Sequence, residues 1–96
     1  MEYEKYINHV SGRKLADIFL FALSTCVWCK KTKRLLDEMG VEYSYVDVDS
    51  LQGVAKIDAL REMHKWDPSQ SFPTIIINEE PVLGYKEAKI KSLLGE

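Results

Sequence analysis

Blocks of apolar residues separated by turn residues predict four β-strands along the chain. A short, nearly continuous apolar run over residues 17–23 is typical of a strand buried on both faces of a sheet. Residues 41–49 are rich in valine and tyrosine and predict a second strand. Residues 75–77 are all isoleucine, and turn residues at 78–81 connect them to a short strand at 82–83, so a hairpin is expected.

A helix is expected between the first two strands, over residues 27–39. Ser24 or Thr25 can act as its N-cap, because a side-chain oxygen there can accept a hydrogen bond from the first turn. Gly40 is the expected C-terminal stop. The residues expected on the inner face are Leu35, Leu36 and Met39.

Two further helices are expected, one after the second strand and one at the end of the chain. The first of these covers residues 51–65, with Asp49 or Ser50 as its N-cap. The last helix opens at Gly84 and Tyr85. In the middle helix the residues near one stripe are Val54, Ile57, Leu60 and His64. In the last helix the apolar side is formed by Ile90, Leu93 and Leu94.

The order β-α-β-α-β-β-α predicts an α/β domain of three layers around a mixed sheet of four strands. In the segment before this domain, apolar residues recur at three- and four-residue steps, which predicts a short helix that ends before Gly12 and covers one sheet edge. These apolar residues are Tyr3, Tyr6, Ile7 and Val10. We therefore divide the chain into an N-terminal extension, residues 1–14, and one domain, residues 15–96.

Composition and charge narrow the possible functions. The 96 residues carry a formal net charge of −2 and contain no biased tract, which gives no indication of nucleic-acid binding. No leader-like apolar segment follows Met1. The longest apolar run, residues 18–23, is far below the roughly 18 residues that suggest a membrane span. We expect a cytoplasmic monomer that binds neither nucleic acid nor membrane.

The only two cysteines, Cys26 and Cys29, form a C-x-x-C motif between the first strand and the first helix. At a helix start, unsatisfied N–H groups and the positive end of the helix dipole stabilise a thiolate, here at Cys26. In such settings a cysteine pKa falls from about 8.5 to roughly 3.5–7.5. Cys29 lies nearly one turn later, on the face of Leu36 and Met39, and should be the more buried sulfur. We predict that Cys26 attacks a substrate disulfide and that Cys29 resolves the mixed disulfide.

Other uses of a C-x-x-C pair are less consistent with the sequence. A zinc site needs two more ligands, and the chain offers only His9 and His64, which are far apart and unpaired. A purely structural disulfide across this spacing closes almost no loop and so removes little entropy from the unfolded chain. The alternative from another class is a non-catalytic module whose thiols hold a metal or a cluster between two subunits.

Three motifs in combination resemble the glutaredoxin family over residues 17–94. They are STCVWC after the first strand, FPT before the third strand, and GY before the last helix. The resemblance implies a thioredoxin-like fold, with Cys26 as nucleophile and Cys29 as resolving cysteine. It also implies a cis bond between Phe72 and Pro73, whose backbone pairs with the extended substrate. The disulfide of the two cysteines is then the redox group, and no further cofactor is expected.

Other positions differ from those of the glutathione-using glutaredoxins. Those proteins resemble one another in a lysine before the first cysteine, Pro-Tyr between the cysteines, and Gly-Gly followed by an aspartate. The corresponding residues here are Leu23, Val27, Trp28, Gly84, Tyr85 and Ala88. Glycine followed by an aromatic residue is similar to the glutaredoxin-like hydrogen donors of ribonucleotide reductase, although those usually keep the aspartate that Ala88 replaces.

This resemblance implies a reductant and a substrate class. A thioredoxin-reductase-type or ferredoxin-linked reductase would supply electrons, and a protein disulfide such as that of ribonucleotide reductase would receive them. Glutathione should bind weakly, because the charged contacts are missing. A conventional glutathione-dependent glutaredoxin is the alternative interpretation.

Aromatic residues near Cys26 are expected to form an apolar rim that docks protein partners, because exposed aromatic patches mark interaction sites. The rim comprises Trp28, Phe72 and Tyr85. The alternative is that Trp28 and Tyr85 pack on the loop beneath them. The predicted substrate-binding residues are Val27, Trp28, Phe72, Pro73, Gly84 and Tyr85. The first helix is also locally basic, which either steers an acidic partner or forms an ordinary solvated face; its basic residues are Lys30, Lys31, Lys33 and Arg34.

Overall fold

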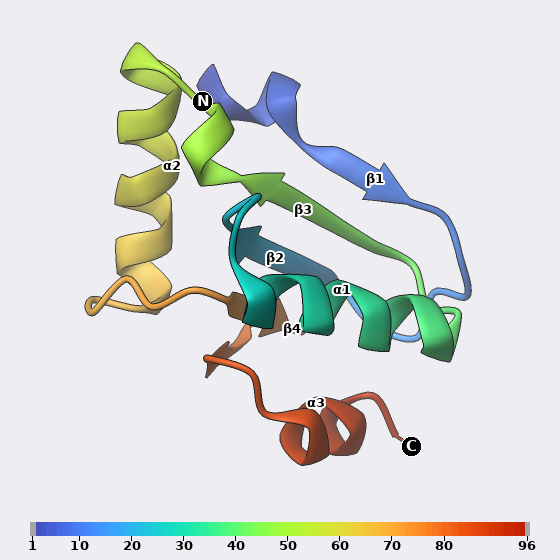
Figure 1. The fold of residues 1–96 in the computed structure, drawn as a ribbon. Coiled ribbons are helices and arrows are strands. Elements are labelled where there is room, and N and C mark those ends of the chain that lie inside the picture. The colour runs from blue at the N-terminus through green and yellow to red at the C-terminus, as the bar shows by residue number, and fades with distance from the viewer. Residues whose placement is uncertain (1, 96) are drawn as a thin grey trace.

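The computed structural model describes residues 2–95 and contains one mixed sheet of five strands (Figure 1). Strands β2 and β3 are parallel, and every other neighbouring pair is antiparallel. The order across the sheet is β1-β3-β2-β4-β5, so β2 is the central strand. The strands are β1 (Asn8–Val10), β2 (Ile18–Ala22), β3 (Tyr43–Asp47), β4 (Thr74–Ile77) and β5 (Glu80–Leu83).

Helices cover both faces of the sheet, which gives the three layers expected from the sequence (Figure 1). On one face lie α1 (Val27–Met39) and α3 (Glu87–Leu93). On the other face lies α2 (Gly53–Trp66), together with the short 3₁₀ turns η1 (Glu2–Tyr6) and η2 (Val48–Ser50). The fold is the thioredoxin-like α/β architecture that the sequence predicts.

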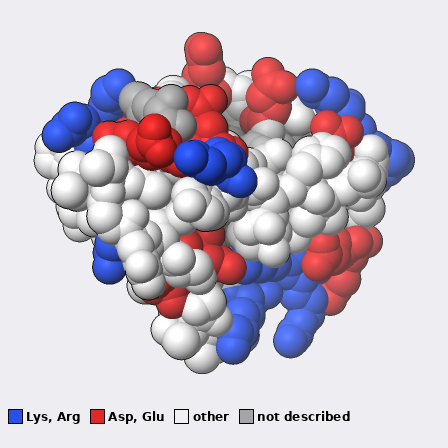
Figure 2. Space-filling model, turned by 90° about the horizontal axis from the view of Figure 1, so that it is seen from above, with Lys and Arg blue, Asp and Glu red and all other residues white. Residues whose placement is uncertain are grey.

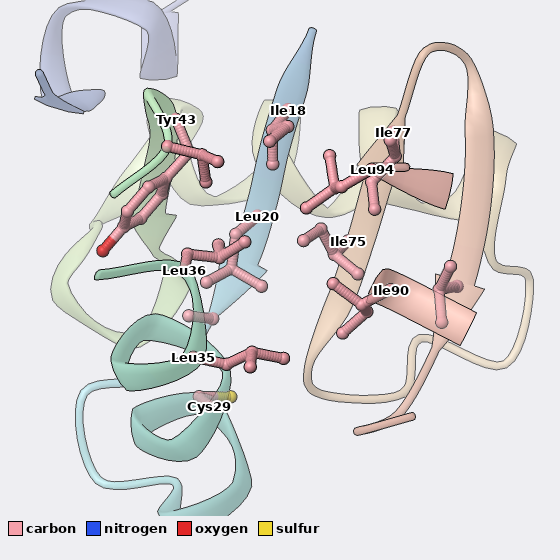
Figure 3. Packing of buried hydrophobic residues seen from close by; sticks show 13 residues of the cluster. Ile18, Leu20, Cys29, Leu35, Leu36, Tyr43, Ile75, Ile77, Ile90 and Leu94 are labelled. Carbon is pink, nitrogen blue, oxygen red and sulfur yellow. The ribbon is translucent and has the colours of Figure 1, made fainter. Parts of the chain in front are cut away.

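The alternating direction of the side chains along β2 explains why this strand is apolar almost throughout. Leu20 and Ala22 pack toward α1 and α3, whereas Phe21 packs toward α2. Side chains on successive residues of a strand point to opposite faces, so a strand covered on both sides needs apolar residues at nearly every position. Figure 3 shows the cluster on the first face, with Ile90 of α3 and Leu94, the residue that caps α3, among its members.

The N-terminal segment adds a strand that the sequence analysis did not predict. Instead of a helix before Gly12, the chain forms η1 and then β1, which pairs antiparallel with β3 and extends the expected four strands to five. The segment does cover a sheet edge, but it does so with backbone hydrogen bonds. The open edge of β3 offers unpaired N–H and C=O groups, and this tertiary pairing outweighs the helical spacing of the apolar residues. Met1 and Glu96, the outer ends of the two predicted segments, lie outside the described residues.

The stripe predicted on α2 is wrong at three of its four positions. Val54 and Ile57 are 61% and 55% exposed, and His64 is exposed as well, whereas Leu60 is partly buried and packs against the core. The residues that α2 buries are Ala55, Ala59 and Met63. Small alanine side chains let the helix lie close to the sheet, and the bulkier Val54 and Ile57 are left on its outer side.

The predicted caps of two helices are also wrong, and the same residues instead bond to each other. The N-cap of α1 is Cys26, and the N-cap of α2 is Gln52, which makes no side-chain capping bond. Ser24 donates to the carboxylate of Asp49 from its backbone N–H, at 2.8 Å, and from its hydroxyl. This contact ties the loop after β2 to the turn after β3.

The other predicted elements are present with bounds that differ by a few residues at most; the last helix begins at Glu87 and not at Gly84, and the second predicted strand is shortened to Tyr43–Asp47. Helix α1 has the predicted bounds and ends at Gly40, whose φ of 67° is left-handed. The hairpin of β4 and β5 turns at Asn78 and Glu79, both at positive φ, and Pro81 lies on the edge strand. No helix within residues 2–95 combines the length and apolar character that a bilayer span requires. Both signs of charge are interspersed around a broad uncharged band on the face that Figure 2 presents.

The corrected packing of α2 can be tested with a matched pair of substitutions. Met63→Ala should lower the free energy of unfolding by about 2–5 kcal/mol, because it leaves a cavity in the core. Ile57→Ala should change it by about 0.5 kcal/mol or less, because its side chain is mostly exposed. Urea unfolding followed by circular dichroism measures both. If Ile57→Ala and Met63→Ala lowered the free energy of unfolding equally, Ile57 would face the core, as the sequence pattern predicted.

Candidate functional site

Cys26 lies at the junction of the central strand and the first helix. It is the N-cap of α1, in extended conformation, and it is partly exposed. Its sulfur accepts a hydrogen bond from the backbone N–H of Cys29 at 3.2 Å. Its own N–H donates to the carbonyl of Leu23 at 3.2 Å. The sulfur therefore lies where helix N–H groups and the helix dipole favour negative charge.

Cys29 occupies a contrasting environment within one helical turn. Its side chain is fully buried, in the cluster formed with the sheet and α3. Figure 3 shows Cys29 and Leu35 on the side of α1 that faces the rest of this cluster. Burial, followed by the hydrogen bond to Cys26, raises the pKa of the Cys29 thiol to about 12. Both cysteines are free thiols in the structure.

The predicted proline lies at the same end of the sheet as the thiols. Phe21 of β2 pairs with Thr74 of β4, and continuing this register by one residue places Pro73 beside Ala22. The peptide bond between Phe72 and Pro73 is cis, as the resemblance implied. Pro73 is buried, and Phe72 is half-buried and packs against both hydrophobic clusters.

A hydrogen bond connects this proline to the last loop of the site. The N–H of Gly84 donates to the carbonyl of Pro73 at 2.7 Å, which holds Gly84 and Tyr85 beside the start of β4. Gly84 has a φ of 78°, a conformation that favours glycine at this turn. The structure thus brings together the three segments that carry the predicted site residues.

Trp28 and Tyr85 form the exposed part of the predicted rim. Their rings stack with centroids 5.7 Å apart, although Trp28 remains 53% exposed. The ammonium of Lys31 lies 4.5 Å from the centre of the Trp28 ring. Val27 is also exposed. An apolar surface therefore borders the half-exposed sulfur of Cys26, and Tyr85 and Phe72 pack against the same cluster as that sulfur.

Asp67 is not among the site residues predicted from the sequence, but its carboxylate organises the segment that leads to Pro73. Asp67 is fully buried and accepts hydrogen bonds from the N–H of Ser69 at 2.9 Å, the N–H of Ser71 at 2.7 Å and the hydroxyl of Thr74 at 2.8 Å. Burial alone raises the pKa of Asp67, but these bonds outweigh it and hold the pKa below its ordinary value. The signal in the sequence is an aspartate followed by proline and serine, a combination typical of Asx turns.

The positions where a glutathione-using site would carry charge have no charged side chain here. Leu23 is half-buried and packs against the cluster under α2, whereas Ala88 is exposed on α3. A shallow groove of about 210 Å³ lies between α1 and α3 next to Tyr85, with charges of both signs along it. Within residues 2–95 no group of three or more histidine, cysteine or acidic side chains is placed to hold a metal ion.

Comparisons with known proteins point to one family. A family model described as glutaredoxin matches residues 18–82. The chain is 47% identical to the glutaredoxin of Methanosarcina mazei, covering 95% of this chain and 89% of that one, with a TM-score of 0.85. It is 45% identical to methanoredoxin of Methanosarcina acetivorans, covering 90% of this chain and 92% of that one, with a TM-score of 0.86.

A more distant structure shares the fold. The glutaredoxin-like NrdH-redoxin of Escherichia coli is 21% identical, with 80% of this chain and 93% of that one covered and a TM-score of 0.66. At this identity the likeness concerns the fold alone.

The role of the buried carboxylate can be tested by stability measurements. Asp67→Ala should lower the free energy of unfolding at neutral pH by at least about 2 kcal/mol, because hydrogen bonds to a charged group contribute about 1.5–3 kcal/mol each. Asp17→Ala is the matched control, since the carboxylate of Asp17 is exposed and pairs with the surface residue Lys14, so the loss of stability should be small.

Acidification gives a second readout of the same network. Because the pKa of Asp67 is lowered on folding, its contribution is present above the unfolded value of about 3.9 and is lost as pH falls through the folded value. The difference in stability between the wild type and Asp67→Asn should therefore shrink as pH falls below about 4. Urea titrations at pH 7 and pH 3 measure it. A difference that stays constant with pH would contradict a charged carboxylate in this network.

Proposed function

The chain belongs to the glutaredoxin family, and from its thiol pair we propose that it is a dithiol–disulfide oxidoreductase that reduces disulfides of protein substrates. The observation that carries this proposal is the contrast between the two sulfurs. Cys26 is partly exposed at a helix start, whereas Cys29 is buried one turn behind it. Such an arrangement suits the exposed thiol for attack on a substrate disulfide and the buried thiol for resolution of the mixed disulfide.

The reaction proceeds in two exchange steps. The thiolate of Cys26 attacks one sulfur of the substrate disulfide, and the other substrate sulfur leaves with the electron pair and takes up a proton. The thiolate of Cys29 then attacks the sulfur of Cys26 in the mixed disulfide, and the second substrate thiol is released. The substrate gains two electrons and two protons, and the protein is left with a Cys26–Cys29 disulfide that a reductant must reopen.

The surface beside Cys26 supports a macromolecular substrate. Trp28 and Tyr85 offer a stacked aromatic pair, and Val27 extends the apolar surface. Tryptophan and tyrosine carry much of the energy in protein interfaces because they bury large areas with few rotatable bonds. We assign substrate contact to these residues and to the backbone around Phe72 and Pro73, with a protein disulfide such as that of ribonucleotide reductase as the substrate class.

We further propose that a reductase, not glutathione, is the main electron donor. Glutathione carries two carboxylates and one ammonium, and a peptide this small buries too little apolar area to bind well without charged partners. Leu23 and Ala88 supply no charged partner for glutathione. A thioredoxin-reductase-type or ferredoxin-linked protein can instead dock on the rim. The thioredoxin-like activity profile of the Escherichia coli NrdH-redoxin supports such use of this fold.

Cysteine substitutions test the division of roles. Cys29→Ser should accumulate a mixed disulfide between Cys26 and the substrate, because the resolving thiol is absent, whereas Cys26→Ser should lose turnover. Mass spectrometry identifies the trapped species, and insulin is a suitable protein disulfide. Iodoacetamide at pH 6 should alkylate Cys26 at least about tenfold faster than Cys29. Equal alkylation rates would overturn the assignment.

A comparison of electron donors tests the choice of reductant. Turnover of insulin disulfides should be slower with millimolar glutathione and its reductase than with NADPH and thioredoxin reductase, or with a ferredoxin-linked reductase. Ala88→Asp should raise the glutathione-supported rate by about tenfold, since one charge-assisted hydrogen bond contributes about 1.5–3 kcal/mol. Ala88→Asn is the matched uncharged control. Faster turnover of the wild type with glutathione would contradict the proposal and support a conventional glutathione-dependent glutaredoxin.

A further inference from the structure

One of the four basic residues of α1 is directed away from solvent. Lys30, Lys31 and Arg34 are exposed, but the side chain of Lys33 is only 21% exposed. Lys33 follows Cys29 by four residues, so the two side chains lie on the same face of the helix. The inner side of α1 therefore carries a cation one turn beyond the buried thiol.

Two contacts hold this cation in place. The ammonium of Lys33 lies 3.1 Å from a carboxylate oxygen of Asp47 and 4.0 Å from the centre of the Tyr45 ring. Asp47 is the last residue of β3 and pairs with Ala22, the last residue of β2. The ion pair thus joins α1 to the strand ends that lead into the thiol loop, and its partly buried position restricts the movement of the ammonium group.

The side chains around Cys29 are mostly apolar. The sheet and α3 contribute apolar side chains to its cluster, including Leu20, Ile75 and Ile90. Three tyrosines also belong to or pack against this cluster, and none of them supplies a cation; they are Tyr43, Tyr45 and Tyr85. Burial and Cys26 raise the pKa of Cys29, whereas a backbone hydrogen bond at Leu23 and the positive charge of Lys33 lower it. Lys33 is the charged side chain among the influences that lower this pKa.

The balance of influences on the pKa of Cys29 changes when the substrate is joined to Cys26 in the mixed disulfide. In the mixed disulfide the sulfur of Cys26 has no charge and no proton to share, so two of the influences that raise the pKa of Cys29 are removed. Burial still opposes ionisation of Cys29, and the Leu23 backbone and the charge of Lys33 still favour it. The charge on Lys33 is thus best placed to act in the state in which Cys29 must react.

We propose that Lys33 is a positioning residue for the resolving step, in which its ammonium, held by Asp47 and Tyr45, stabilises the thiolate form of Cys29. This proposal rests on the proposed function. In this step Cys29 releases its proton to solvent, forms a bond to the sulfur of Cys26, and displaces the substrate sulfur with its electron pair. Asp47→Asn keeps a side-chain oxygen that can accept from the ammonium, and the contact with the Tyr45 ring remains, so Lys33 stays in place while the opposing negative charge is removed. The field of Lys33 on Cys29 should therefore be undiminished or stronger in this variant.

The two steps can be separated with one chromophoric disulfide. Reduced protein is mixed in a stopped-flow instrument with one equivalent of 5,5′-dithiobis(2-nitrobenzoate). Attack by Cys26 releases a first thionitrobenzoate, and attack by Cys29 on the mixed disulfide releases a second. The first phase therefore tests the proposed function, and the second phase tests the role of Lys33. Both rates are measured between pH 6 and pH 9.

Lys33→Met should slow the second phase by roughly threefold to tenfold, because the rate follows the thiolate fraction at pH values below the thiol pKa. Its pH profile should shift to higher pH, while the first phase changes by less than about twofold. Lys33→Arg should recover most of the rate, because it keeps the charge. Lys30→Met, which removes an exposed charge, is the matched control and should leave the second phase unchanged.

The Asp47→Asn variant decides between an electrostatic and a structural role. If the charge on Lys33 acts on Cys29, Asp47→Asn should keep or raise the rate of the second phase. If the ion pair only holds α1 in place, Asp47→Asn and Lys33→Met should both slow it, and that result would overturn the proposal. Urea midpoints for both variants show whether the fold is retained. Absence of a first phase in the wild type would count against the proposed function itself.

Discussion

The position of β2 between a parallel and an antiparallel neighbour is the constraint on which the rest of the structure depends. Because β3 runs in the same direction as β2, and β4 in the opposite direction, three loops meet where β2 ends. One loop leads to Cys26, one carries Asp49, and one carries Pro73. Each loop is then fixed by local hydrogen bonds, but the sheet register brings them together.

Burial supplies the chemical difference between two otherwise equivalent thiols. Only two residues, Val27 and Trp28, separate a sulfur at the helix start from one inside the core, so identical side chains meet opposite environments. A buried thiol is protected from bulk oxidants and from water, yet it must ionise to react. The same helix carries Cys29 and, one turn later, the partly buried Lys33.

Much of this arrangement was predictable from the sequence where the signals are local. The C-x-x-C at the start of α1 and the glycine after its end indicated the bounds of this helix, and a uniformly apolar strand indicated a sheet covered on both faces. Contacts between segments that are distant in the sequence were not predictable in the same way. Ser24 and Asp49 are good capping residues, and nothing in their own segments shows that each finds its partner in the other loop. Lys33 belongs to a run of basic residues, and only its alignment with Asp47 distinguishes it from solvated neighbours.

The two ends of the sheet have a consequence for the behaviour of the protein in a crowded cell. An unpaired strand edge is a template on which foreign chains can extend a sheet, and it invites aggregation. Here one edge is the three-residue strand β1, and the other edge, β5, contains Pro81, which has no N–H to donate. Both edges are therefore poor templates. A chain with an exposed strand therefore finds little backbone at either edge on which to extend this sheet.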